Sequence, residues 1–219
     1  MTRIGFLSFG NWSNVQGSLT RTGGDAILQG IELAVAAEEV GVDGAYYRVH
    51  HFAKNYSSPY PMLAAAAART SRIELGTGVI DMRYENPLAM AEYAAATDLI
   101  SGGRLQLGIS RGSPETSIAG YEVFGHVPGL GEGARQDETD ADMARRHTAA
   151  FREAITGAGL AAANPQMVGM AGLLPVTPQS QGLAQRIWWG AGTRATAVWA
   201  AEQGMNLMSS TLLTEDTGV

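Results

Sequence analysis

Short apolar segments alternate with longer helical segments along most of the chain, and this alternation constrains the fold more than any other feature. Runs of aliphatic and β-branched residues between turn signals indicate strands, and apolar residues recurring every three or four positions indicate helices. Parallel strands joined by helices form right-handed βαβ units. The expected strands are residues 4–9, 43–49, 72–80, 104–110, 186–191 and 206–211, and the expected helices are residues 25–41, 61–70, 86–101, 138–156 and 193–203.

Two stretches show neither the apolar runs of strands nor the three-to-four-residue spacing of helices. Residues 112–137 contain six glycines and two prolines, and residues 157–185 are rich in Gly, Ala and Pro, so both are expected to be irregular. A doubly wound sheet and a β/α barrel both satisfy the alternation. A complete eight-stranded barrel typically needs about 250 residues. Six strands in 219 residues therefore leave a barrel incomplete.

The composition excludes several classes of function. Charged residues make up 16% of the chain and apolar residues 45%, which is typical of a globular protein, and the net charge of −6 argues against nucleic acid as a partner. The absence of cysteine excludes disulfides, thiolate metal sites and cysteine nucleophiles. No leader and no run of 18 apolar residues occurs, so we expect a cytoplasmic protein that does not bind membranes.

An arginine ends the fourth expected strand. Arg111 follows the strand expected over residues 104–110, which carries Leu105, Leu107 and Ile109, and precedes Gly112. Ligands of α/β proteins bind at the C-terminal ends of parallel strands, and a guanidinium there suits a phosphate or a carboxylate. The same pattern is equally typical of a surface arginine after a buried strand.

The second expected strand runs into two adjacent histidines. Alternation along the strand places Tyr46, Arg48 and His50 on one face and His51 on the other, so the two histidines are not expected to share a metal ion. A histidine at this end of a strand suits a general acid or base, or a hydrogen-bond donor. A structural histidine bonded to a neighbouring loop is the alternative.

The third and fifth strands carry further signals at the same end. Gly76 and Gly78 indicate a bulge, or a place where a flat ligand lies against the backbone. Thr193 opens a helix whose N–H groups, with the hydroxyl of Thr196, suit an anion, although Thr193 is also an ordinary helix cap. Because four strands carry such signals at one end, we expect one ligand site there.

In these segments the chain resembles the bacterial luciferase-like flavin monooxygenases, a superfamily of β/α barrels. The resemblance implies that residues 1–219 form a single domain, a (β/α)8 TIM-type barrel without its C-terminal part, since relatives continue through two more strands and a lid. The alternative is a natural short form that binds flavin without turnover. The residues that carry the resemblance are His50-His51-Phe52, Leu75-Gly76-Thr77-Gly78-Val79, Gly103-Arg104 through Arg111-Gly112, and the segment from Trp188 to Gly204.

The resemblance also implies a site for reduced FMN at the C-terminal mouth of the barrel. Arg111 would pair with the phosphate, and His50 matches the catalytic histidine of the luciferase branch. The peptide between Gly78 and Val79 matches a position where the family has a non-proline cis bond. The residues implied to bind the cofactor are Gly78, Val79, Arg111, Gly192, Thr193 and Thr196.

The implied reaction is oxidation of a small aldehyde-like molecule by oxygen and reduced FMN, with His50 as proton donor or acceptor. A flavin reductase would supply the cofactor, and a homodimer would form through the helices beside the second and third strands. A deazaflavin-dependent oxidoreductase is the alternative activity. Val49 stands where the luciferase branch has glutamate. This difference argues against luciferase-type aldehyde chemistry and not against flavin binding.

Overall fold

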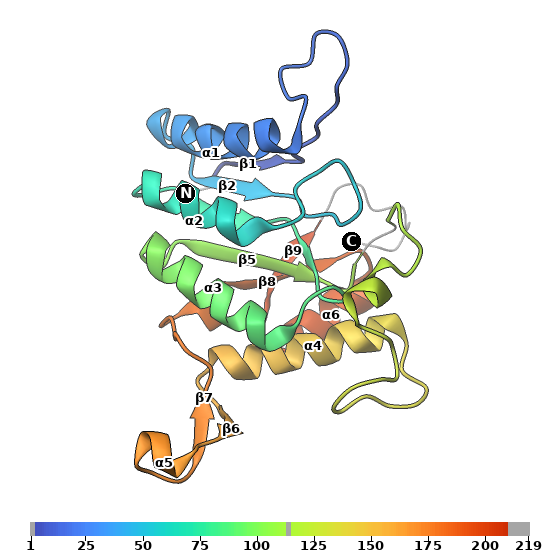
Figure 1. The fold of residues 1–219 in the computed structure, drawn as a ribbon. Helices are drawn as coiled ribbons and strands as arrows, with labels where there is room; N and C mark the ends of the chain where they lie inside the picture. The colour runs from blue at the N-terminus through green and yellow to red at the C-terminus, as the bar shows by residue number, and fades with distance from the viewer. Residues whose placement is uncertain (1–2, 113–114, 210–219) are drawn as a thin grey trace.

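The computed structural model describes residues 3–112 and 115–209, and these form a curled parallel sheet with helices on its convex side (Figure 1). The strands follow the order β1-β2-β3-β5-β8-β9, with β4 beside β5. They are β1 (Gly5–Ser8), β2 (Gly44–Tyr47), β3 (Glu74–Thr77), β4 (Ile80–Asp81), β5 (Leu105–Ser110), β8 (Ile187–Ala191) and β9 (Asn206–Ser209). β3 and β4 are the two halves of the single strand expected over residues 72–80.

The curl brings the two ends of the strand order towards each other. Leu7 of β1 and Met208 of β9 line the same cavity, although β1 and β9 are the first and last strands of the sheet. The architecture is therefore an open part of a β/α barrel, which confirms the expected α/β class and the incomplete barrel. Residues 210–211, at the end of the sixth expected strand, lie outside the described residues.

Five helices follow the strands as expected, and polar caps set where they begin. Thr22, Thr139 and Thr193 each form a capping box, and the Asn86 side chain accepts from the backbone N–H groups of Leu88 and Ala89. The helices are α1 (Gly23–Glu39), α2 (Pro59–Arg69), α3 (Pro87–Ser101), α4 (Asp140–Ile155) and α6 (Arg194–Glu202).

The core lies between the sheet and the helices. On β5, Leu105, Leu107 and Ile109 belong to the buried apolar cluster, and the residues between them face the concave side. On β8, Trp189 is fully buried and its ring packs edge-on against Trp199 of α6, 4.7 Å between centroids. The alternation thus gives each strand one face for the core and one for the open side.

Two glycines let neighbouring strands approach closely. A Cβ on Gly76 would overlap the carbonyl oxygen of Gln106, and one on Gly108 would overlap the carbonyl oxygen of Thr77. No rotamer change can move a backbone oxygen, so any side chain at these positions would push the strands apart. The concave side of the sheet is consequently lined partly by backbone.

The prediction that residues 157–185 are irregular was wrong. They contain a hairpin of β6 (Gly159–Ala162) and β7 (Leu173–Pro175), the short helix α5 (Pro165–Val168) and the 3-10 helix η2 (Leu183–Arg186). The strands are three or four residues long and mostly exposed, so they lack the alternation that reveals a strand. A second 3-10 helix, η1 (Gly120–Phe124), lies within the loop expected at residues 112–137.

Charged side chains are tightly bound at the N-terminal ends of the strands. Asp98 of α3 is fully buried and accepts hydrogen bonds from Arg186 Nη2 at 2.6 Å, Ser180 Oγ at 2.7 Å and the Leu105 N–H at 3.1 Å. Glu38 of α1 accepts from three successive backbone N–H groups that precede β3. Burial alone would raise the pKa of Glu38, but these N–H donors lower it to about 2.

None of the helices in the described part of the chain combines the length and the apolar character that crossing a bilayer requires.

Candidate functional site

A cavity of about 480 Å³ lies on the concave side, at the C-terminal ends of the strands. Its volume falls within the range of small-molecule and cofactor sites. Four of the residues expected at the site line it, and they come from three separate segments of the chain. These residues are His50, Gly78, Val79 and Gly192.

One side of this cavity combines an unusual peptide bond with closely packed glycines. The peptide bond between Gly78 and Val79 is cis, as the resemblance implied. A Cβ on Gly190 would lie 3.1 Å from a methyl group of Val79, and one on Gly78 would lie 2.9 Å from a methyl group of Leu7. The two glycines therefore let the side chains of Val79 and Leu7 pack directly against the backbone on this side of the cavity.

Arg111 lies at the rim of the cavity. Its neighbours Ser110 and Gly112 both line the cavity, while the Arg111 side chain is exposed and forms no ion pair with any described residue. Ile109 pairs with Trp189 in the parallel register of β5 and β8, so Arg111 and Gly192 leave the sheet at adjacent strand ends. The Ser113–Pro114 pair that follows lies outside the described residues.

The start of α6 is already capped by its own side chains. Thr193 Oγ1 accepts from the Thr196 N–H at 3.3 Å, and the buried Thr196 donates its hydroxyl to the Thr193 carbonyl at 2.9 Å. A contact between the Thr196 hydroxyl and a ligand would therefore have to replace this bond. The N–H groups of Arg194 and Ala195 lie in the first turn, which the helical ladder does not use.

His50 is paired with a residue that sequence reasoning did not assign to the site. Arg48 Nε donates a hydrogen bond to His50 Nε2, and both side chains line the cavity. Burial lowers the pKa of His50, and the charge of Arg48 lowers it further, while Asp81 acts in the opposite direction. The alternation on the second strand had placed Arg48 and His50 on one face, which was the available signal.

Two carboxylates on the cavity wall were also missed. Asp81 binds Arg83 through both oxygens, with an Arg83 Nη2 to Oδ2 distance of 2.7 Å. Glu115 accepts from the Tyr84 hydroxyl, and burial together with Asp81 raises the pKa of Glu115. Asp81 follows the expected third strand by one residue, and Glu115 lies in a loop with no readable pattern.

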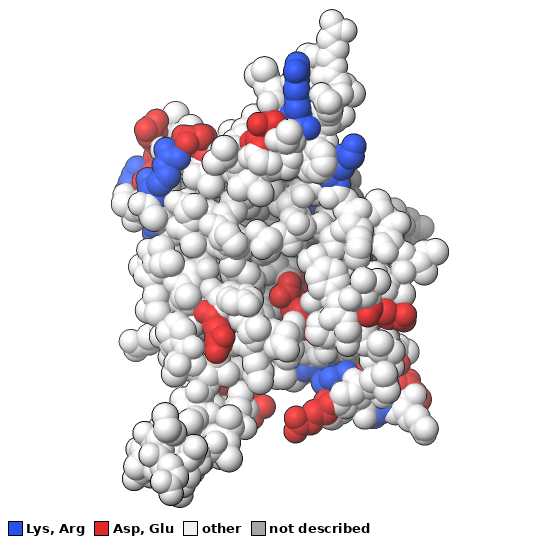
Figure 2. All heavy atoms as spheres, viewed as in Figure 1, with Lys and Arg blue, Asp and Glu red and all other residues white. Residues whose placement is uncertain are grey.

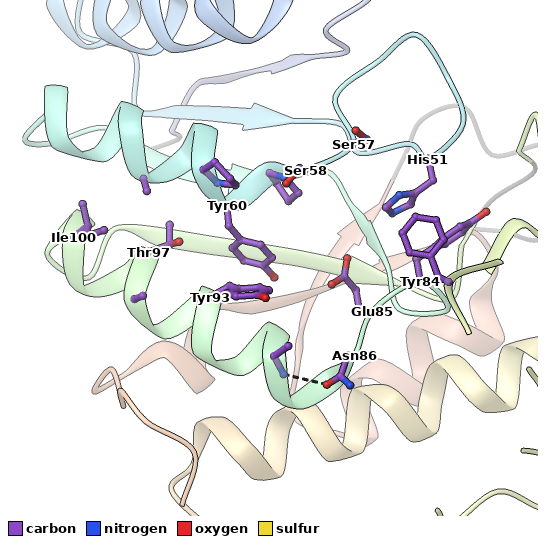
Figure 3. A pocket seen from close by; sticks show the side chains of 16 residues that line it. His51, Ser57, Ser58, Tyr60, Tyr84, Glu85, Asn86, Tyr93, Thr97 and Ile100 are labelled. Carbon is purple, nitrogen blue, oxygen red and sulfur yellow. Dashed lines mark hydrogen bonds between the residues drawn. The ribbon is translucent and has the colours of Figure 1, made fainter. Parts of the chain in front are cut away.

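A second and larger cavity, of about 810 Å³, lies between α2 and α3 (Figure 3). Glu85 points into it, between Tyr60 and Tyr93 on one side and His51 on the other. Burial raises the pKa of Glu85 to about 7, with a further contribution from Asp81. The buried Tyr60 hydroxyl and His51 Nε2 find no hydrogen-bond partner among the described residues.

The surface over α2 and α3 carries little charge. In Figure 2, drawn from the same side as Figure 1, this region is nearly all uncharged apart from acidic side chains, and Lys and Arg lie towards its margins. The exposed apolar side chains on α3 include Tyr93 and Ile100, each 53% exposed. In the described ranges 3–112 and 115–209, no three His, Asp or Glu side chains come close enough to hold a metal ion.

Comparison with known proteins identifies a family and several sequence relatives. The profile of the luciferase-like monooxygenase family matches residues 6–217. The chain is 36% identical over 109 residues to a 4-hydroxyprotoasukamycin monooxygenase of Streptomyces nodosus subsp. asukaensis, which covers 49% of this chain and 29% of that protein. It is 35% identical over 103 residues to the oxygenase component of a flavin-dependent trigonelline monooxygenase of Acinetobacter baylyi, covering 46% and 27%.

A third relative uses a different kind of cofactor. An F420-dependent glucose-6-phosphate dehydrogenase of Amycolatopsis mediterranei is 34% identical over 95 residues, covering 41% of this chain and 28% of that protein. In each of these comparisons the matched segment spans less than a third of the length of the relative.

Solved structures share the fold over nearly the whole chain. A monooxygenase of Streptomyces bottropensis aligns with a TM-score of 0.70 and 24% identity, covering 94% of this chain and 59% of that one. The oxygenating constituent of 3,6-diketocamphane monooxygenase of Pseudomonas putida, in complex with FMN, aligns with a TM-score of 0.68 and 18% identity, covering 94% and 57%. The chain therefore corresponds to a little over half of each of these barrels.

Proposed function

We propose that the chain, which belongs to the luciferase-like monooxygenase family, is a flavin-dependent monooxygenase acting with reduced FMN and oxygen. The observation that carries the proposal is the cavity of about 480 Å³, where His50, Gly78, Val79 and Gly192 meet at the C-terminal ends of the strands. Sequence relatives named as monooxygenases support the reaction class.

The residues of this cavity fit a flavin. Gly78, Gly190 and Gly192 present backbone and no side chain to the cavity, beside the cis peptide between Gly78 and Val79, and such a surface suits a planar ring. The exposed Arg111 side chain and the first turn of α6 suit a phosphate, since both offer N–H donors to an anion. We assign the phosphate to Arg111, the backbone of Gly192 and Thr193, and the Thr196 hydroxyl, and the ring to Gly78 and Val79.

When bound, reduced FMN supplies the two electrons that reduce one oxygen atom to water while the other enters the substrate. The substrate class that we propose is a small aldehyde-like molecule, which would leave as the carboxylic acid. His50 exchanges a hydrogen bond or a proton with the reacting oxygen. The apolar side chains of Leu7, Val79 and Met208 line one side of the cavity and offer water no hydrogen-bond partner there.

The phosphate assignment is tested by comparing two ligands in one variant. Arg111→Ala should weaken FMN binding about 10- to 100-fold, since a hydrogen bond to a charged group contributes about 1.5–3 kcal/mol. Riboflavin lacks the phosphate, so its affinity should stay the same. Fluorescence titration of both ligands measures this, with Arg72→Ala as the control arginine at the opposite end of the strands.

Equal affinity for FMN in wild type and Arg111→Ala would remove Arg111 from the site. Equal losses for FMN and riboflavin would show a general disturbance of the cavity and not a lost phosphate contact.

A deazaflavin-dependent oxidoreductase is the second candidate activity. It is favoured by the relative from Amycolatopsis mediterranei, whose name states dependence on F420. The two activities are separated by titrating the protein with FMN and with F420 in parallel. Binding of F420 alone would replace the monooxygenase proposal.

We also propose that a separate flavin reductase supplies the reduced cofactor. The relative from Acinetobacter baylyi is named as an oxygenase component, and a structural neighbour is named as an oxygenating constituent, which indicates divided systems in both cases. With FMN, oxygen and NADH present, the protein should therefore oxidise its substrate when a purified flavin reductase is added, and not when the reductase is left out.

The proposed oligomer is a homodimer that covers α2 and α3. The apolar cavity between these helices and the low charge of the surface over them suit a protein partner with a similar apolar face. Ala96→Arg on α3 should give monomers in sedimentation experiments, while Ala36→Arg on the exposed side of α1 should not. A wild-type monomer at high concentration would contradict the proposal.

A further inference from the structure

Arg48 lies beside His50 and is held in place by groups other than His50. It directly follows β2, and its backbone N–H donates to the Ser8 carbonyl of β1 at 2.9 Å. Its guanidinium carbon lies 5.1 Å from the centre of the Phe9 ring, a distance at which a cation is attracted to the ring face. Contacts with Ser8 of β1 and with Phe9, the next residue, therefore fix the direction of the guanidinium.

The contact between Arg48 and His50 defines where the imidazole carries its hydrogen. An arginine side chain has N–H donors only and no acceptor, and it stays protonated at every physiological pH. Because Arg48 Nε points its hydrogen at His50 Nε2, that ring nitrogen must supply the lone pair. A neutral imidazole then has its hydrogen on Nδ1, and an imidazolium would bring two N–H groups together.

The surroundings of His50 also oppose a positive charge. Half-burial disfavours the imidazolium, and Arg48 adds a like charge at hydrogen-bond distance. Asp81 acts in the opposite direction, but both of its oxygens bind Arg83. Glu115 also lines the cavity, and burial together with Asp81 raises its pKa, which shifts it towards its uncharged form.

We propose that Arg48 is a positioning residue that holds His50 uncharged, with its hydrogen on Nδ1 and its Nε2 lone pair occupied. The consequence for catalysis rests on the function proposed above: His50 enters the reaction as a hydrogen-bond donor through Nδ1 and not as a general base through Nε2. Arg48 acts through His50 and needs no contact with the substrate.

The proposal is tested by nitrogen NMR of the flavin-free protein, in which Nδ1 and Nε2 of histidine give distinct signals in each tautomer. The His50 signals are assigned from their loss in His50→Gln. In the wild type we expect the Nδ1–H tautomer at neutral pH. Arg48→Met keeps an unbranched side chain at this position but removes the charge and the donor, so the His50 pKa should rise by about one unit and the Nε2–H form should appear.

Two further variants separate this role from a structural one. Arg48→Lys keeps a cation with N–H donors and should restore the low pKa of His50 and much of the tautomer preference. Lys54→Met removes a cation from the same loop, where Lys54 Nζ lies 5.2 Å from the centre of the Trp12 ring, and should leave the His50 signals unchanged. Proton–nitrogen spectra of each variant confirm that it is folded.

A hydrogen on Nε2 of His50 in the wild type at neutral pH would overturn the proposal, and so would unchanged His50 signals in Arg48→Met. If Arg48→Met does not fold, the wild-type tautomer and Arg48→Lys still decide. These measurements need no cofactor, so a failure of FMN to bind would refute the proposed function and leave this result standing. If turnover is measurable, its acid limb should move to higher pH in Arg48→Met by the same amount as the pKa.

Discussion

Asp98 and Glu38 at the N-terminal ends of the strands differ from Arg111, His50 and Glu115 at the C-terminal ends in how their polar groups are used. At the N-terminal end, Asp98 is fully buried and bound by three donors, and Glu38 binds three successive N–H groups. At the C-terminal end, Arg111 is exposed without an ion-pair partner in the described chain, and the pKa values of His50 and Glu115 are shifted towards their uncharged forms.

This difference separates stability from binding. Groups whose partners are all within the protein stabilise the fold and have nothing left to offer a ligand. Groups that still have open donors or are held uncharged contribute little to stability, but they are available for a ligand or a proton. In β/α barrels, the same division places the active site at the C-terminal face of the strands.

The largest expected effect on stability is at Asp98. Asp98→Ala leaves Arg186 without its buried partner and should lower the free energy of unfolding by about 3–5 kcal/mol, measured by urea denaturation. Glu92→Ala, on the exposed side of the same helix, should change it by less than about 0.5 kcal/mol. Equal losses of unfolding free energy in the two variants would contradict the stabilising role assigned to Asp98. Asp98→Asn can replace Asp98→Ala if the latter does not fold.

A smaller effect is expected at Glu38. Glu38→Gln keeps the shape but removes the charge that the three N–H groups bind, so stability at pH 7 should fall by about 1–2 kcal/mol after allowing for solvent screening. The pKa of Glu38 is lowered in the folded state, so its contribution is complete above the ordinary value of 4.5 and is lost as the pH falls towards about 2.

The difference in unfolding free energy between wild type and Glu38→Gln should therefore shrink between pH 4.5 and pH 2. A difference that stays constant over this range would show that the bound carboxylate charge is not the cause.

The smallest effect on stability is expected at the opposite end of the strands. Arg111→Ala should change the free energy of unfolding by less than about 0.5 kcal/mol, although the same variant is expected to lose FMN affinity. Thermal unfolding of the flavin-free protein checks the first part. A clear loss of stability would mean that Arg111 has a structural partner, and the contrast between the two ends would weaken.

Much of the fold could be predicted from the sequence, because each main strand is an apolar run with a turn signal at its ends. The convergence of His50, Gly78, Val79 and Gly192 on one cavity could be predicted too, since parallel strands end at one edge. The contact between Arg48 and His50 could not, because it depends on side-chain conformations that alternation does not determine.

Other parts escaped prediction for different reasons. Glu115 reaches the cavity from a loop, where no periodicity relates a residue to its position in space. The cavity around Glu85 depends on how closely α2 lies beside α3, which neither helix encodes alone. The hairpin of β6 and β7 pairs only within itself in the described sheets, so the alternation of the larger sheet says nothing about it.

That hairpin has a practical use. Its tip, around α5, projects away from the sheet, on the side opposite the C-terminal ends of the strands (Figure 1), and Met167 and Met170 there are largely solvent-exposed. A peptide tag or a surface anchor inserted after Val168 would extend outward, where Gly169 already turns the chain with a φ of 70°. The protein could thus be immobilised or labelled at a point remote from the cavity, without using either terminus.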